Sequence, residues 1–135
     1  MKVLITGVAG FIGSELAKRL KDQYKVIGID DLNYNLGLGN DNNIPNGIEF
    51  HNINIKDHKA INKIILENDI KVIYHLAAIS DTRCDDEKEI NLVNVEASKT
   101  FLKLLDLLIF LSYMHLLQQF MLMEINQLIY MLVQN

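Results

Sequence analysis

Hydrophobic positions in the first hundred residues follow two different repeats, one typical of strands and one typical of helices. Short apolar runs with the composition of buried strands span residues 2–6, 24–29, 48–55 and 71–78. Apolar side chains at helical spacing occupy residues 14–22, 60–66 and a segment that begins near Glu87. The resulting order βαββαβα predicts an α/β fold with a parallel sheet that helices cover on both faces.

The order of elements also predicts where a ligand would bind. In a Rossmann-type doubly wound sheet, the first and fourth strands lie side by side at the switch point where a ligand sits. Residues 33–47 are rich in Asn and Gly and are expected to form a loop. Asp86, followed by Glu89 three residues later, predicts a capped start for the helix near Glu87.

The pattern changes near residue 107. All 13 Lys and Arg residues lie at or before Lys103, and all seven glycines precede position 48. Residues 107–123 carry no charge, but this run falls short of the roughly 18 apolar residues typical of a membrane span, so no membrane binding is predicted. We therefore predict a boundary between residues 1–107 and a helical or disordered tail, 108–135.

Composition narrows the classes of function. A chain of 135 residues suits one domain, and a net charge of −4 without a basic block argues against nucleic-acid binding. Cys84 is the single cysteine, which excludes an internal disulfide and a cysteine zinc site and is typical of a cytoplasmic protein. His51 and His58 lack an evident third ligand, so no metal site is predicted.

A glycine-rich turn follows the first predicted strand. Gly7, Gly10 and Gly13 have G-x-x-G-x-x-G spacing and precede a helix. The first glycine permits a tight turn, the second lets a diphosphate approach the backbone, and the third lets the helix pack closely on the strand. The free N–H groups at the start of the helix would then face the phosphates. An ordinary strand-to-helix turn is the alternative, but the context favours binding of a dinucleotide cofactor.

An acidic pair ends the second predicted strand. Asp30 lies 17 residues after Gly13, close to the spacing of an acid that accepts hydrogen bonds from the adenosine ribose. Asp31 adds negative charge beside it. No Lys or Arg lies between Lys25 and Lys56 to bind a ribose 2′-phosphate. The sequence therefore predicts NAD rather than NADP.

Four segments together resemble the extended short-chain dehydrogenase/reductase family, the NAD-dependent epimerase/dehydratases of nucleotide sugars. They are TGVAGFIGS, VIGIDDLN, VIYHLAAISDTR and NLVNVEAS, and the resemblance covers residues 1 to about 107. It implies a nucleotide-sugar substrate for the full-length family member and NAD as the cofactor. The residues that it implies for NAD binding are Gly7, Gly10, Phe11, Ile12, Gly13, Asp30, Leu76, Ala77, Ala78 and Asn94. Asn54 and Ile55 stand where the family usually has an aspartate and an aliphatic residue near the adenine.

The catalytic residues that the resemblance implies are missing. Members of the family use a tyrosine as the acid/base and a lysine four residues later that lowers its pKa. The residues four positions after the five tyrosines are Gly28, Leu38, Ala78, Leu117 and Gln134. No catalytic residue is therefore assigned. Two hypotheses follow: a nucleotide-sugar epimerase or dehydratase by descent, or an inactive, truncated NAD-binding fragment.

A shifted reading frame would explain the tail. Read from the third base of each codon, Met114-His115 forces alanine and Met123-Glu124 forces glycine. The codons between these pairs permit SSAAVY, and the preceding codons permit FIY. The composite string, FIYASSAAVY, resembles the family's fifth strand and its serine motif. We therefore interpret residues 108–135 as a frameshifted tail, and the competing interpretation is a genuine pair of amphipathic helices. Sequencing of the gene distinguishes the two.

Overall fold

The computed structural model describes residues 1–33, 39–81 and 84–133, and it gives the surroundings of side chains up to residue 126. It divides into two compact units, Met1–Thr100 and Phe101–Asn135. The predicted loop residues 34–38 lie outside the described residues. The elements are β1 (Lys2–Thr6), α1 (Phe11–Leu20), β2 (Lys25–Asp30), η1 (Asp41–Asn43), β3 (Glu49–Asn52), α2 (His58–Glu67), β4 (Ile70–His75), α3 (Glu87–Asn91), the π-helix η2 (Leu92–Glu96) and α4 (Ala97–Val133).

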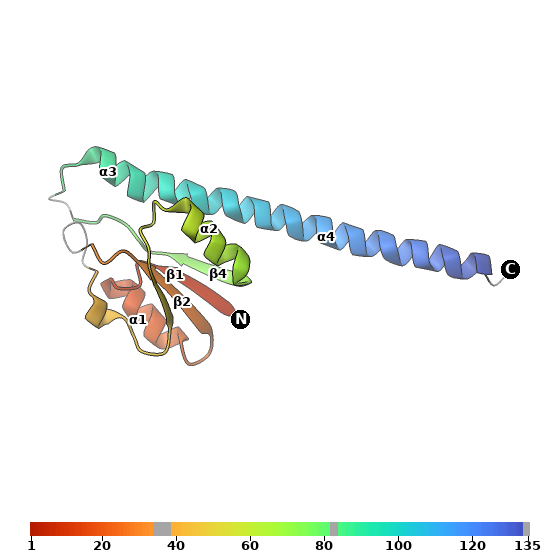
Figure 1. Ribbon diagram of the computed structural model, residues 1–135, viewed down its shortest axis with the longest axis horizontal. Helices are drawn as coiled ribbons and strands as arrows, with labels where there is room; N and C mark the ends of the chain where they lie inside the picture. Colours follow the sequence, from red (N-terminus) through yellow and green to blue (C-terminus); the bar gives the residue numbers. More distant parts are fainter. Residues whose placement is uncertain (34–38, 82–83, 134–135) are drawn as a thin grey trace. The chain divides into compact units, whose positions relative to one another are not determined.

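The first unit contains a four-stranded sheet in the order β3-β2-β1-β4, and all three pairings are parallel. The connection from β1 through α1 to β2 runs towards the β3 edge of the sheet. The connection from β3 through α2 to β4 runs the opposite way, towards the β4 edge. Because such crossovers are right-handed, α1 and α2 lie on opposite faces of the sheet (Figure 1). β1 and β4 are neighbours, so the predicted Rossmann-type topology and its switch point are confirmed.

The core lies on both faces of the central strands. Val3 and Ile5 pack with Val8, Ala17 and Val26 in one buried cluster on the α1 side. Leu4 alternates to the opposite face and is fully buried. On that side α2 contributes its three buried isoleucines, which are Ile61, Ile64 and Ile65. This two-sided burial explains why the strand sequences are continuously apolar.

Two predicted strands are shorter than their apolar runs. The run 48–55 forms a strand only over Glu49–Asn52, and the run 71–78 leaves the sheet after His75. Beyond the sheet both runs continue as loops. The Ile53 N–H donates to the backbone carbonyl of Asp30, whereas the N–H groups of Leu76 and Ala77 donate to the side chain of Thr6. The N-terminal cap of α3 is confirmed, because the Asp86 carboxylate accepts a hydrogen bond from the Glu89 amide at 2.9 Å. The Glu89 side chain pairs with Lys56 and so does not complete a capping box.

The second unit consists of the continuation of α4 from Phe101. Its large apolar side chains are exposed around the helix rather than along one stripe, as for Ile109, Phe110, Leu111 and Met123. The predicted tail is therefore helical as far as Val133. Among the described residues, one helix, Glu87–Asn126, is long and apolar enough to cross a membrane. Length and composition alone do not place a helix in a membrane, so the expectation of no membrane binding stays a prediction.

We expect this exposed apolar helix to make the purified chain self-associate, because contiguous apolar surface of this extent is a protein-association site or an aggregation liability. The double substitution Leu111→Lys and Phe120→Lys should shift the sedimentation coefficient towards that of a 15.5 kDa monomer. Gln118→Lys with Gln119→Lys adds the same charge and removes no apolar side chain, so it should have a smaller effect. A wild-type chain that sediments as a monomer would contradict this expectation.

Candidate functional site

The glycine turn joins β1 to α1 at the carboxyl end of the sheet. Gly7 has a φ of +71°, and a Cβ placed on it would lie 2.8 Å from the backbone of Leu76 and Ala77. Its N–H donates to the carbonyl of Ile29 at 2.8 Å, which anchors the turn to β2. Only glycine meets both requirements, because other residues rarely adopt this φ and none has room here.

The start of α1 leaves backbone N–H groups open to a ligand. Gly10 is the N-cap, no side chain caps the helix, and its first turn has no acidic residue. Ser14 is the first residue of the helix whose N–H binds within it, to the carbonyl of Gly10 at 3.0 Å. The free donors and the positive end of the helix dipole make this terminus a suitable place for an anion.

Four hydrogen bonds hold the two carboxylates at the end of β2. The Asp30 carboxylate accepts from the amides of Ala9 and Leu32, both at 3.0 Å. The Asp31 carboxylate accepts from the Asn33 amide at 3.1 Å and from Asn54 Nδ2 at 2.6 Å. Because each Asp30 oxygen keeps a further acceptor position, this fixed carboxylate can still accept hydrogen bonds from hydroxyl groups of a ligand.

The segment after β4 forms the opposite wall of the site. Thr6, which is fully buried, accepts hydrogen bonds through Oγ1 from the amides of Leu76 and Ala77 at 3.1 and 3.2 Å. Farther along, Asn94 binds both backbone groups of Ile79. The chain therefore leaves the sheet along a path that specific side chains fix.

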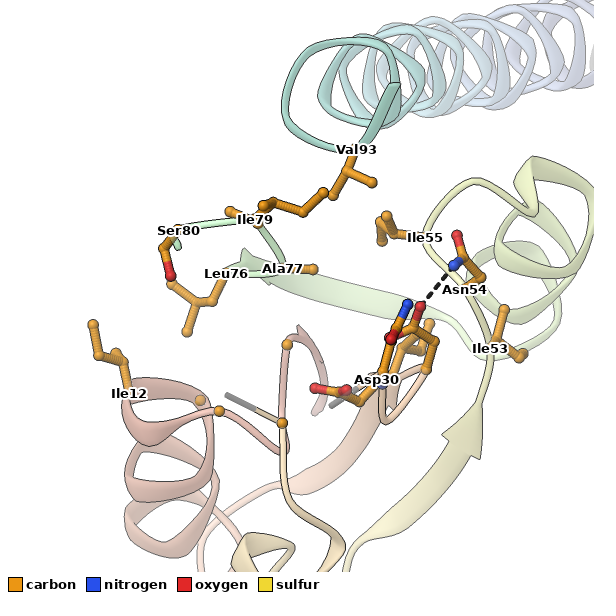
Figure 2. Close-up of a pocket in the computed structure, with 18 of the residues that line it drawn as sticks. Ile12, Asp30, Ile53, Asn54, Ile55, Leu76, Ala77, Ile79, Ser80 and Val93 are labelled. Carbon is orange, nitrogen blue, oxygen red and sulfur yellow. Dashed lines mark hydrogen bonds between the residues drawn. The ribbon is translucent and has the colours of Figure 1, made fainter. Parts of the chain in front are cut away.

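These elements enclose a cavity of about 340 Å³. Figure 2 shows Asp30 and Asn54 on one side, Leu76 and Ala77 on the other, and Val93 above them. All the residues predicted to bind the cofactor line the cavity, with the exception of Asn94: Gly7, Gly10, Phe11, Ile12, Gly13, Asp30, Asp31, Asn54, Ile55, Leu76, Ala77 and Ala78.

Eight further residues line the cavity that were not predicted from the sequence: Ile29, Asn33, Gly39, Ile53, Ile79, Ser80, Glu89 and Val93. Ile79 and Ser80 directly follow Ala78, so the wall simply extends beyond the predicted strand. Glu89 and Val93 come from the helix that begins at Glu87 and carried no sequence signal for the site. Phe11 and Ile12 line the cavity while remaining 84% and 67% exposed, which leaves apolar surface for a ligand to cover.

A chain of hydrogen-bonded polar side chains lies behind the wall; Thr6 is buried, and His75 and Ser98 are half-buried. Because Thr6 Oγ1 already accepts two amide hydrogens, its hydroxyl donates to His75 Nδ1 at 2.8 Å. His75 Nε2 then donates to Ser98 Oγ at 3.0 Å, and that hydroxyl donates to the Asn94 carbonyl at 2.9 Å. This order of bonds assigns a neutral imidazole. Burial agrees with it, because it lowers the pKa of His75 below the ordinary value of 6.5.

His75 should make stability depend on pH. Below about pH 6.5 the His75 side chain of the unfolded chain binds a proton, whereas that of the folded chain does not. The free energy of unfolding therefore decreases as the pH is lowered, until the pH reaches the lowered pKa of His75 in the folded state. The contribution of His75 to the free energy of unfolding can change by at most about 1.4 kcal/mol per pH unit, because one proton is involved. Urea unfolding between pH 5 and 8 should show a shallower slope for His75→Asn than for wild type. Equal slopes would contradict this account.

Comparison with known proteins identifies the family. The sequence model of the NAD dependent epimerase/dehydratase family matches residues 3–110. The chain therefore belongs to the NAD-dependent epimerase/dehydratase family. A putative UDP-glucose 4-epimerase of Methanocaldococcus jannaschii is 42% identical over 82 residues, which cover 60% of this chain and 25% of the relative. The chain spans between 20% and 27% of the length of the first curated relatives that it matches.

Solved structures agree with this assignment. The UDP-glucose 4-epimerase of Thermotoga maritima with UDP-glucose has a TM-score of 0.70 and 27% identity, over 77% of this chain and 33% of that one. The UDP-glucose 4-epimerase of Thermus thermophilus in complex with NAD has a TM-score of 0.68 and 27% identity, with the same coverage. The shared part is thus about a third of each enzyme.

Proposed function

We propose that the first unit binds NAD in the cavity between the glycine turn and residues 76–80. The observation that carries this proposal is the convergence on one cavity of three features: a helix start without a side-chain cap, the glycine turn and a fixed carboxylate, Asp30. The helix start would face the diphosphate, and Asp30 would accept hydrogen bonds from the adenosine ribose. NAD in the related Thermus epimerase supports the choice of cofactor.

The residues on the adenosine side favour NAD over NADP. Asp30 and Asp31 place two carboxylates at the end of β2, and Asn54 holds the second of them. A 2′-phosphate there would meet negative charge, and the nearby Lys56 already pairs with Glu89. Calorimetric titration of the whole chain should show binding of NAD and much weaker binding of NADP. Absence of heat with NAD in a folded sample would refute the proposal.

We propose the chemistry of the family only for a full-length family member that contains a segment like residues 1–107. Curated relatives of this chain are named as UDP-sugar epimerases, so we propose a nucleotide sugar as the substrate of such a full-length protein. When NAD is bound, its nicotinamide supplies reversible hydride transfer. The 135-residue chain has no Tyr-x-x-x-Lys pair to move the accompanying proton. We therefore propose that this chain binds NAD without turnover, and measurable epimerisation of UDP-galactose by it would refute that.

We further propose that residues 108–135 result from a shifted reading frame. The absence of basic residues after Lys103 and the all-round apolar character of the helix support this proposal. The DNA sequence of the gene tests it. Codons that encode the expected FIYASSAAVY string in the alternative frame would support the proposal, and codons that cannot encode it would refute it.

A further inference from the structure

Asn94 makes a two-way contact with the backbone of the cavity wall. Its Oδ1 accepts from the Ile79 N–H at 2.8 Å, and its Nδ2 donates to the Ile79 carbonyl at 3.0 Å. A side-chain amide thereby satisfies both backbone groups of a residue that has left the sheet, much as a neighbouring strand would. Asn94 itself is not among the residues that line the cavity, whereas Ile79 is.

The helix is distorted at this contact. Residues Leu92–Glu96 form the π-helix η2 between two α-helical segments, and π-helical turns are frequent at functional sites. Within this turn Val93 is buried and lines the cavity, while the next residue, Asn94, reaches Ile79. One turn later Ser98 accepts from His75, at the other end of the same wall. The helix therefore holds the wall at both ends.

We infer that Asn94 is a positioning residue for NAD, which acts on the cavity through the backbone of Ile79 rather than by contacting the cofactor. This inference rests on the proposed function and deepens it. Residues 76–80 all line the cavity, so the path of this wall decides the width of the site. Thr6 fixes the start of the path through Leu76 and Ala77, and Asn94 fixes its end.

The substitution Asn94→Asp tests the contact because it changes one atom. At pH 8 the introduced carboxylate can accept from the Ile79 N–H but repels the Ile79 carbonyl. Protonation at lower pH restores a donor towards that carbonyl. Asn94→Ala removes both bonds at every pH. Asn91→Asp, at an exposed position on the same helix, introduces the same charge away from the wall and serves as the matched control.

Two measurements on the whole chain distinguish this inference from the proposed function. Without NAD, amide hydrogen exchange of Ile79 should be faster in Asn94→Ala than in wild type and unchanged in Asn91→Asp. With NAD, Asn94→Asp should bind about tenfold more weakly than wild type at pH 8, which corresponds to the loss of about one strong hydrogen bond. Titrations from pH 8 to pH 5.5 should show this ratio shrink for Asn94→Asp and stay constant for Asn94→Ala.

Each other outcome is decisive. Wild-type exchange of Ile79 in Asn94→Ala would overturn the contact itself. Faster exchange with unchanged NAD affinity would overturn the positioning role. Weaker NAD binding by Asn94→Ala, with unaltered Ile79 exchange, would assign Asn94 a direct contact with the cofactor and overturn the inference. Failure of wild type to bind NAD would refute the proposed function, while Ile79 exchange would still report on the contact.

Discussion

Replacement of Gly13 by alanine should destabilise the first unit by about 3 kcal/mol or more, at the upper end of the cost of overpacking. A Cβ on Gly13 would lie 2.1 Å from the Gly7 carbonyl oxygen and 3.0 Å from the Cα of Val8. Both neighbours are backbone atoms, so α1 would have to move away from β1. Because whole domains are stable by only about 5–15 kcal/mol, urea unfolding should show a large fall in the midpoint.

Gly10→Ala is the matched control for this prediction. A Cβ on Gly10 would meet one atom, the Gly7 carbonyl oxygen, at 3.2 Å, and the φ of −77° and ψ of 171° of Gly10 suit alanine. Its loss of stability should therefore be much smaller. If the Gly13→Ala chain were as stable as wild type, this would contradict the close packing of α1 on the turn.

Replacement of Asp30 by alanine should weaken NAD binding by about 10- to 100-fold, the effect of losing one or two hydrogen bonds to a charged group. Discrimination against NADP should fall at the same time, because the carboxylate that repels a 2′-phosphate is gone. The Ala9 amide, which donates to Asp30 at 3.0 Å, also loses its partner, so the glycine turn should become less ordered. Calorimetric titration with both dinucleotides measures the two effects.

Asp85→Ala controls for the change in net charge, because Asp85 is an exposed acid of the same unit and does not line the cavity. Its affinities for NAD and NADP should match those of wild type. If Asp30→Ala retained both the wild-type affinity and the wild-type selectivity, the ribose would have to bind elsewhere, and the assignment of Asp30 would fail.

The sequence was sufficient to predict the topology and most of the cavity. Strands buried on both faces are apolar throughout, and glycine is required wherever a helix packs directly on a strand end, as at Gly13. Each of these two requirements concerns residues that are close together in the sequence. The placement of the glycine turn and of Asp30 on one cavity therefore follows from local patterns that the sequence displays directly.

The helical side of the cavity could not be predicted in the same way. Val93 and Glu89 reach the cavity because the chain returns across the sheet, and no local pattern encodes that approach. The apolar run 71–78 also concealed the end of β4 at His75, because Leu76 and Ala77 are bound by the side chain of Thr6, some seventy positions earlier. The contact between Asn94 and Ile79 depends on a π-helical turn, which the sequence spacing did not indicate.

The most direct test of NAD binding at this site is a titration of the isotopically labelled chain followed by its backbone amide resonances. Saturation with NAD should shift the amides of Gly7, residues 10–13, Asp30 and residues 76–80 most strongly, and should leave those of α2 nearly unchanged. A folded chain whose amides do not respond to NAD, or whose largest shifts lie outside the cavity, would contradict the account.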